Sequence, residues 1–212
     1  HEECTIAARA AGALRARLGH HVDDQWPAAI GDASFAAHFR TIVATWTAND
    51  VAVLERTIGR EAGPDDVEAD NLALAAIGRS VSGPAYVAAM LEVHRWCRTV
   101  LSWWHPADGS SGYDLLVTPT IAVPPPRIGY LSEPGKGGRV FELLQYTAQF
   151  NVTGQPAISL PLHWSADGLP VGVQLVAAYG REDLLVRVAA QLEAAAPWAD
   201  RVPPVSAARP AS

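Results

Sequence analysis

The chain has 212 residues, of which 49% are hydrophobic and 18% are charged, a composition that is globular and excludes long disordered segments. Its formal net charge is −6 at pH 7, with one lysine and no basic run, which argues against binding nucleic acid or an anionic membrane. No apolar stretch approaches the roughly 20 residues that a membrane helix needs, so we expect a soluble, cytoplasmic protein without membrane or nucleic-acid partners.

The first 112 residues are predicted to be mainly helical. Small and apolar residues recur every three or four positions over residues 2–18, and Gly19 ends this helix because glycine readily adopts left-handed backbone angles. A short strand is expected at residues 20–22. A second amphipathic stripe follows Ser34, its predicted cap, and we expect an interruption near residues 49–50 before the helix resumes.

Two further helices are expected before residue 112. The first follows the turn at residues 63–66 and has Leu72, Ala76 and Ile77 on one side. The second begins at Ser82, and the proline two positions later fits because its missing N–H costs little in the first helical turn. Apolar residues at three- and four-residue steps make this second helix the clearest amphipathic helix of the chain.

Residues 113–196 are predicted to form a strand, a helix, a β-hairpin and a final helix. The expected bounds are residues 114–118 for the strand, 139–150 for the helix, 157–162 and 171–176 for the hairpin, and 182 or 183 for the start of the last helix. Pro161 and Pro170 lack an amide donor, so each should lie at a strand end, a bulge or a sheet edge. Residues 197–212 are expected to be an irregular tail, and we treat all three segments as one domain.

A long ordered set of motif positions runs through this second segment. Residues 113–126 read YDLLVTPTIAVPPP, and residues 146–176 carry T---N-TG-PA-S-P followed by GLP-G-QL. This arrangement closely resembles the C-terminal part of the amidase signature family. The matching positions are Tyr113, Asp114, Leu115, Leu116, Pro119, Thr120, Thr147, Asn151, Thr153, Gly154, Pro156, Ala157, Ser159, Pro161, Gly168, Leu169, Pro170, Gly172, Gln174 and Leu175.

The resemblance implies an α/β fold, in which a mixed β-sheet is covered by α-helices, and an amidase that hydrolyses linear carboxylic amides. The family uses a nucleophilic serine, a second serine and a lysine base, all upstream of the matched region. We therefore expect no catalytic residue in this chain, no cofactor and no metal. The expected partners are the N-terminal catalytic half and a small amide substrate, and a homo-oligomer is possible through exposed apolar surface. The alternative is a stand-alone binding or assembly module derived from an amidase.

By the same resemblance, part of the acyl pocket lies in this chain. Its expected substrate contacts are Thr118, Leu144, Phe150, Asn151, Thr153 and Gln155. The alternative is that Asn151, Thr153 and Gly154 simply build a turn. Leu144 occupies the position where the related glutamine-using amidotransferase subunit carries an acidic residue. It cannot hold a substrate ammonium, so we expect an uncharged acyl group.

Other candidate chemistry is weaker. Ser110 and Ser111 with Lys136 would supply a Ser-Ser-Lys set, but they lie in loops outside the family's catalytic segment, so we interpret them as loop residues. The chain has no GxSxG nucleophile elbow and no HExxH or CxxC spacing, which argues against a Ser-His-Asp triad or a zinc site. Cys4 and Cys97 are expected to be thiols in a reducing compartment, with a disulfide as the alternative.

Overall fold

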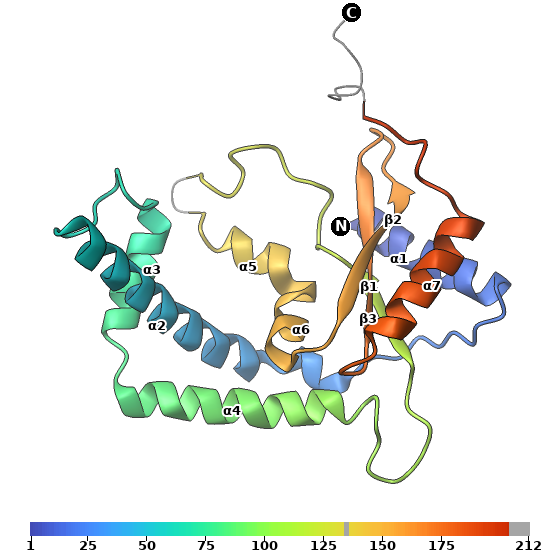
Figure 1. The fold of residues 1–212 in the computed structure, drawn as a ribbon, viewed down its shortest axis with the longest axis horizontal. Coiled ribbons are helices and arrows are strands. Elements are labelled where there is room, and N and C mark those ends of the chain that lie inside the picture. The colour runs from blue at the N-terminus through green and yellow to red at the C-terminus, as the bar shows by residue number, and fades with distance from the viewer. Residues whose placement is uncertain (134–135, 204–212) are drawn as a thin grey trace, which may run out of the picture. The chain divides into compact units, whose positions relative to one another are not determined.

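The computed structural model describes residues 1–133 and 136–203, so most of the expected tail and part of the glycine-rich loop lie outside the described residues. The chain divides into two compact units (Figure 1). We call His1–Gln25 together with the chain from Ser111 onward the sheet unit, and Trp26–Ser110 the helical unit. Among the described residues no single helix is long and apolar enough to cross a membrane, although two helices of the helical unit, Ala69–Arg79 and Gly83–Leu101, reach that length and composition together and are bent by 105° at their junction.

The helical unit contains one 3-10 turn and three α-helices: η1 (Ala28–Gly31), α2 (Ala33–Ile58), α3 (Ala69–Arg79) and α4 (Gly83–Leu101). The interruption predicted at residues 49–50 is wrong, because α2 runs unbroken through them. Asn49 and Asp50 point to solvent, whereas Ala48 and Val51 on either side are buried against α3, so packing outweighs the low helix propensity of the polar pair. The cap of α2 is Asp32 and not Ser34: the Asp32 Oδ1 accepts from the Ser34 backbone N at 2.8 Å.

Helices α2 and α3 approach each other closely at Gly78. A Cβ atom on this glycine would lie 1.9 Å from the backbone oxygen of Ala44 and 2.9 Å from the Cβ of Ala48. Real Cβ atoms never approach a carbonyl oxygen so closely, so only glycine fits between the two helices at this point. Ala75 and Gly78 are the buried residues of α3, whereas Ile77 is exposed.

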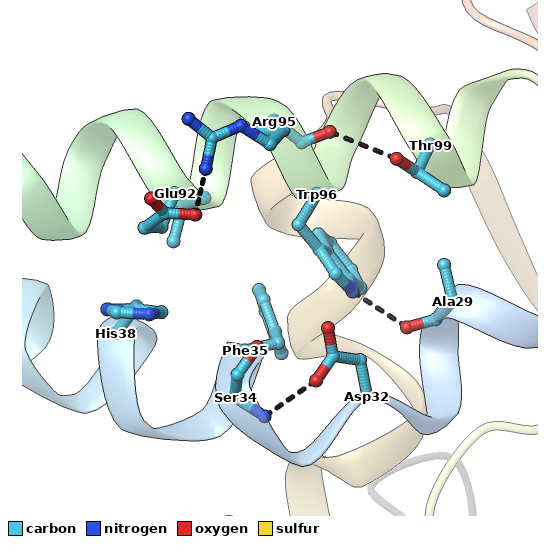
Figure 2. Close-up of a pocket in the computed structure, with 10 residues that line it drawn as sticks. Ala29, Asp32, Ser34, Phe35, His38, Glu92, Arg95, Trp96 and Thr99 are labelled. Atoms are coloured by element: carbon cyan, nitrogen blue, oxygen red, sulfur yellow. Dashed lines mark hydrogen bonds and ion pairs between the residues drawn. The ribbon is translucent and has the colours of Figure 1, made fainter.

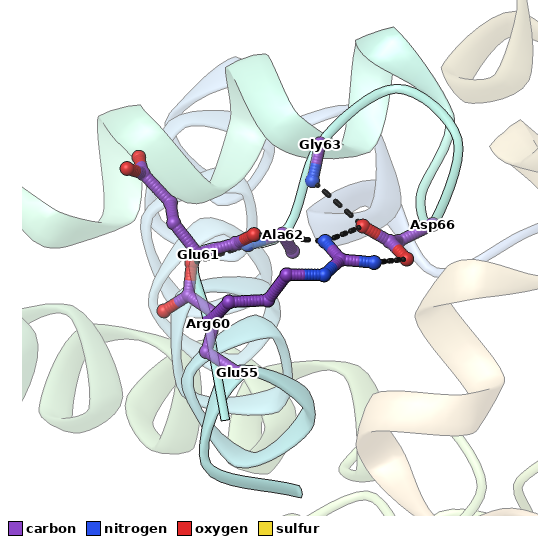
Figure 3. Close-up of polar contacts among 6 residues, drawn as sticks. All are labelled: Glu55, Arg60, Glu61, Ala62, Gly63 and Asp66. Atoms are coloured by element: carbon purple, nitrogen blue, oxygen red, sulfur yellow. Dashed lines mark hydrogen bonds and ion pairs between the residues drawn. The ribbon is translucent and has the colours of Figure 1, made fainter. Parts of the chain in front are cut away.

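The loop between α2 and α3 is held by a polar cluster (Figure 3). The Arg60 guanidinium binds both carboxylate oxygens of Asp66, at 2.6 and 2.8 Å, and the Gly63 backbone N donates to the same carboxylate at 3.0 Å. The Arg60 hydrogen bond, followed by the Gly63 N–H, lowers the pKa of Asp66 to about 2. A two-pronged arginine–carboxylate pair of this kind fixes the loop in one conformation.

The described part of the sheet unit holds three antiparallel strands in the order β1-β3-β2, with β1 at Leu115–Pro119, β2 at Ala157–Trp164 and β3 at Pro170–Ala177. The register of the hairpin is shifted at a bulge between Leu160 and His163, which contains Pro161, while Pro170 is the first residue of β3. Both prolines therefore lie where the missing donor is tolerated, as predicted. Gly168, in the turn between β2 and β3, has a φ of 76°, a backbone conformation that glycine tolerates best.

One face of the sheet is covered by two helices, α1 (Glu2–Arg17) and α7 (Glu182–Ala195). Alternate residues of β3 point to this face: Val171 and Val173 pack with Cys4, Ala7 and Ala11 of α1, and Leu175 and Ala177 pack with Leu185, Val188 and Leu192 of α7. Helices α1 and α7 lie near opposite ends of the printed sequence, and this apolar layer packs both of them against β3. We call the opposite surface of the sheet the polar face, defined by Thr118, Thr120, Ser159, Gly172 and Gln174.

Two further predictions of local structure are wrong. Residues 20–22 form no strand, because the His20 backbone N is already bonded to the Arg15 carbonyl at 3.1 Å in the closing turn of α1. The single helix expected at residues 139–150 is divided into α5 (Arg139–Leu143), η2 (Leu144–Tyr146) and α6 (Ala148–Thr153). The division falls at Thr147, whose φ of −118° departs from helical values, and β-branched residues weaken helices at such points.

Candidate functional site

The candidate site is built on the polar face, where side chains of all three strands meet. Thr118 of β1 and Ser159 of β2 both lie directly opposite Gln174 of the central strand β3. Because successive side chains alternate between the faces of a sheet, the three side chains point to the same side. Thr120 joins them just beyond β1, where its backbone N bonds to the Gly172 carbonyl at 3.0 Å.

Gln174 organises one end of this polar face. The side chain is 5% exposed, and its Nε2 donates to the Thr118 Oγ1 at 3.0 Å and to the Tyr146 carbonyl at 2.7 Å. Both amide hydrogens are therefore used inside the fold, which connects β1 and β3 to η2. Thr118, a predicted substrate contact, is thereby held in a defined orientation.

A pair of hydroxyl groups lies at the other end of the polar face. The Thr120 Oγ1 and the Ser159 Oγ are 2.6 Å apart, and Ser159 is exposed. Ser159 and Gln174 were not predicted as site residues, although both belong to the family motifs. Their alternation with apolar residues along short strands was the available signal, because it places them on one face once the strands are paired.

The predicted contacts Thr153 and Gln155 are buried, Thr153 as the last residue of α6 and Gln155 in the turn that follows. The Thr153 Oγ1 donates to the Gln155 Oε1 at 3.0 Å, and the Gln155 Nε2 donates to the Ala177 carbonyl at 2.9 Å. Gly154 between them has a φ of 71°, a conformation that glycine tolerates best. The polar atoms of both side chains thus bond within the protein and fix the entry into β2.

The remaining predicted contacts differ in exposure. Leu144 of η2 is 38% exposed and Asn151 of α6 is exposed, whereas Phe150 is only 4% exposed and belongs to the core. Gln149, the neighbour of Phe150, is 9% exposed, and its Oε1 finds no hydrogen-bond partner among the described residues. A buried acceptor without a donor costs roughly 1–3 kcal/mol. The Gln149 carbonyl oxygen therefore keeps an unused acceptor position among the described residues.

A cavity of about 140 Å³ lies in the helical unit between α2 and α4 (Figure 2). Its wall includes Phe35 and Trp96, whose rings stack with centroids 3.9 Å apart, and the Trp96 Nε1 donates to the Ala29 carbonyl at 2.7 Å. The charged groups around it are also engaged, since Asp32 caps α2 and Arg95 pairs with Glu92. These contacts are those of packing between α2 and α4.

The weaker catalytic candidates remain in structural roles. Ser110 donates from its hydroxyl and from its backbone N to the Asp108 Oδ1, at 2.7 and 3.0 Å, which makes a local turn and lowers the pKa of Asp108. His163 binds the Glu3 carboxylate at 2.8 Å and joins β2 to α1. The described residues contain no cluster of three or more potential metal ligands, and no disulfide joins Cys4 to Cys97.

Comparison with known proteins gives a consistent set of relatives. The family model described as Amidase matches residues 30–186. The 6-aminohexanoate-cyclic-dimer hydrolase of Paenarthrobacter ureafaciens is 43% identical over 95% of this chain, and the match spans 42% of that hydrolase. A putative amidase, AmiC, of Mycobacterium leprae is 50% identical over 44% of this chain and 20% of its own length.

Solved structures agree with these relatives. A 6-aminohexanoate cyclic dimer hydrolase complexed with substrate superposes with a TM-score of 0.86 at 43% identity, over 95% of this chain and 43% of that chain. A bacterial aryl acylamidase of the amidase signature family superposes with a TM-score of 0.67 at 21% identity, over 93% of this chain and 41% of that one, a likeness of fold alone. The predicted α/β fold is confirmed, and the chain spans about 42% of the length of the curated hydrolase it matches.

Proposed function

The chain belongs to the amidase family, and we propose that it is the C-terminal part of an enzyme that hydrolyses carboxylic amides. The observation that carries this proposal is the meeting of the family's motif residues on one polar face, with Gln174 between Thr118 and Ser159. In this proposal the reacting serine, the second serine and the lysine belong to an N-terminal part. We call the polypeptide that contains this chain together with that part the complete enzyme.

In this proposal, residues of the N-terminal part carry out the steps that break the amide bond. Its serine attacks the amide carbonyl, the amine or ammonia leaves with a proton, and water then releases the carboxylic acid from the acyl-enzyme. This chain supplies the acyl pocket, with Thr118, Leu144, Phe150 and Asn151 as its lining. Thr153 and Gln155 shape that pocket by fixing the turn between α6 and β2.

The proposed substrate is a small amide with an uncharged acyl group. Leu144 is apolar and 38% exposed, so it offers no carboxylate to a substrate ammonium. The relative with 43% identity is named for a cyclic dimer, whereas the family resemblance favours linear amides, so both classes belong in the test. We also propose that the N-terminal part covers the apolar side chains that this chain exposes. Self-association through those side chains is the alternative when this chain is alone.

The proposal is tested by assaying the complete enzyme against linear aliphatic amides, aryl amides and a cyclic diamide, with release of amine or acid as the readout. We expect turnover of at least one uncharged amide and poor turnover of a matched substrate with a terminal ammonium. Replacing Leu144 by Glu should improve the ammonium substrate relative to the uncharged one. A complete enzyme that hydrolyses none of these amides would refute the proposed function.

A further inference from the structure

The hydroxyl pair of Thr120 and Ser159 bridges two strands that are not neighbours. Thr120 follows β1 and Ser159 lies in β2, on opposite sides of β3. Adjacent strands are about 4.8 Å apart, so the two backbones are separated by about 9.6 Å. The side-chain oxygens nevertheless approach to 2.6 Å, directly above the intervening strand.

Gly172 of β3 makes this approach possible. A Cβ atom at position 172 would lie 2.7 Å from the Ser159 Oγ and 2.7 Å from the Thr120 Oγ1. Any other residue would therefore enter the space in which the hydroxyl groups meet. The backbone of Gly172 is not in the left-handed region, so its conformation does not require a glycine. What requires a glycine at this position is the space that the two hydroxyl groups occupy.

The pair keeps unused hydrogen-bonding capacity at an accessible position. Two hydroxyl groups have two donor hydrogens, and the bond between them uses one, which leaves one O–H donor and several acceptor lone pairs. Ser159 is exposed and Thr120 is half-buried. By contrast, both amide hydrogens of the neighbouring Gln174 are already bonded to Thr118 and Tyr146. The hydroxyl pair therefore presents one free donor and free acceptors side by side, whereas the Gln174 amide has no donor left.

We propose that the Thr120–Ser159 pair is a positioning site for the primary carboxamide group of the substrate, a role that rests on the proposed function. A primary carboxamide carries an acceptor oxygen and a donor N–H on the same edge, at a spacing slightly shorter than that of the two hydroxyl oxygens. One hydroxyl donates to the carbonyl and the other accepts the N–H. An N-alkyl amide in its trans form turns its single N–H away from the carbonyl, and an ester has no N–H, so neither can engage both hydroxyls.

The test compares the complete enzyme with the variants Thr120→Val, Ser159→Ala and Gly172→Ala, using a primary amide, its N-methyl derivative and its methyl ester. We expect KM for the primary amide to rise about three- to tenfold, the value of one neutral hydrogen bond, without a matching fall in kcat. KM for the N-methyl amide and the ester, which can keep only the bond to their carbonyl, should rise less than KM for the primary amide. Thr120→Ser, which keeps the hydroxyl, should restore KM.

Two controls separate this site from a structural role. Gly31→Ala adds a methyl where nothing lies within 4 Å, and Ser102→Ala removes a hydroxyl from the helical unit, so both should leave all three KM values unchanged. If the wild-type complete enzyme hydrolyses amides but the variants raise KM equally for all three substrates, or for none, the positioning site is refuted while the proposed function stands. If the wild type hydrolyses no amide, the proposed function fails first.

Discussion

Gln174 donates to the Thr118 hydroxyl across the β1–β3 pair, at 3.0 Å, and thereby holds the one predicted substrate contact that lies on a strand. The same Nε2 reaches the Tyr146 carbonyl at 2.7 Å, so a single buried amide connects the sheet to the segment before α6. The shape of the polar face depends on this connection. Its loss would affect stability and site geometry together.

Replacing Gln174 by Ala should therefore destabilise the protein. The substitution leaves the Tyr146 carbonyl and the Thr118 hydroxyl without their donor, and an unsatisfied buried group costs about 1–3 kcal/mol. Urea denaturation followed by circular dichroism measures the change in unfolding free energy. The matched control is Gln145→Ala, which removes an exposed glutamine side chain from η2 and should change that free energy by less than about 0.5 kcal/mol. Equal losses for the two variants would contradict the role given to Gln174.

The contact between α2 and α3 gives a second prediction. Gly78→Ala places a methyl 1.9 Å from the Ala44 carbonyl oxygen, so the helices must separate, at a cost of about 1–3 kcal/mol. Gly83→Ala, at the start of α4, has open space around the added methyl and should be neutral or stabilise by up to about 1 kcal/mol. Thermal denaturation of both variants measures these changes in stability. A Gly78→Ala protein as stable as the wild type would show that the helices are not packed as described.

The loop of Figure 3 gives a prediction about pH. The pKa of Asp66 is lowered in the folded protein to about 2, and an unfolded aspartate titrates near 3.8. A group with a lowered folded pKa contributes stability that is present above its unfolded pKa and is lost as the pH falls. The contribution of Asp66 should therefore be lost between about pH 4 and pH 2.

NMR titration of the Asp66 carboxyl carbon measures this pKa. In Arg60→Gln the largest cause of the lowered value is gone, so the midpoint should move up toward the ordinary value, and the remaining Gly63 N–H should keep it slightly below. Arg56→Gln, in the last turn of α2, is the control and should leave the midpoint unchanged. A midpoint for Asp66 near 3.8 in the wild-type protein would rule out the ion pair.

The cavity wall of Figure 2 gives a fourth prediction. Trp96→Phe keeps an aromatic ring beside Phe35 but removes the N–H that bonds to the Ala29 carbonyl at 2.7 Å. We expect a loss of about 1–3 kcal/mol, because a partly buried acceptor is left without its donor. Trp46→Phe is the control: its indole N–H bonds to the Tyr86 hydroxyl at 2.9 Å, but Trp46 is 61% exposed, so water can replace that partner. Chemical denaturation of the chain should show a larger loss of unfolding free energy for Trp96→Phe than for Trp46→Phe.

The sequence allowed elements with strong local signals to be predicted. The start of α4 predicted at Ser82 is confirmed, since the Ser82 hydroxyl accepts from the Ala85 N at 3.2 Å. The predicted start of the last helix is confirmed too, because α7 begins at Glu182. The hairpin and its turn at Gly168 also follow from local residues, since few residues tolerate the backbone angles of that turn.

Features decided by tertiary contacts could not be predicted in this way. Nothing local to Gly78 indicates that a carbonyl of α2 lies against it, and nothing near Thr120 indicates a partner 39 residues away. The bond from the Gln174 Nε2 to the Tyr146 carbonyl likewise joins separate elements, and nothing near Tyr146 in the sequence indicates it. The polar face emerges only when β1, β2 and β3 are paired in register, because its members come from three distant segments.

We propose that this chain shapes an amide pocket around a reaction centre that another part of the enzyme supplies. The direct measurement is the rate of amide hydrolysis by the purified 212-residue chain and by the complete enzyme, on the same substrates. We predict no turnover above the uncatalysed rate for the chain alone and clear turnover for the complete enzyme. Turnover by the chain alone that disappears on replacing Ser110, Ser111 or Lys136 would contradict the claim.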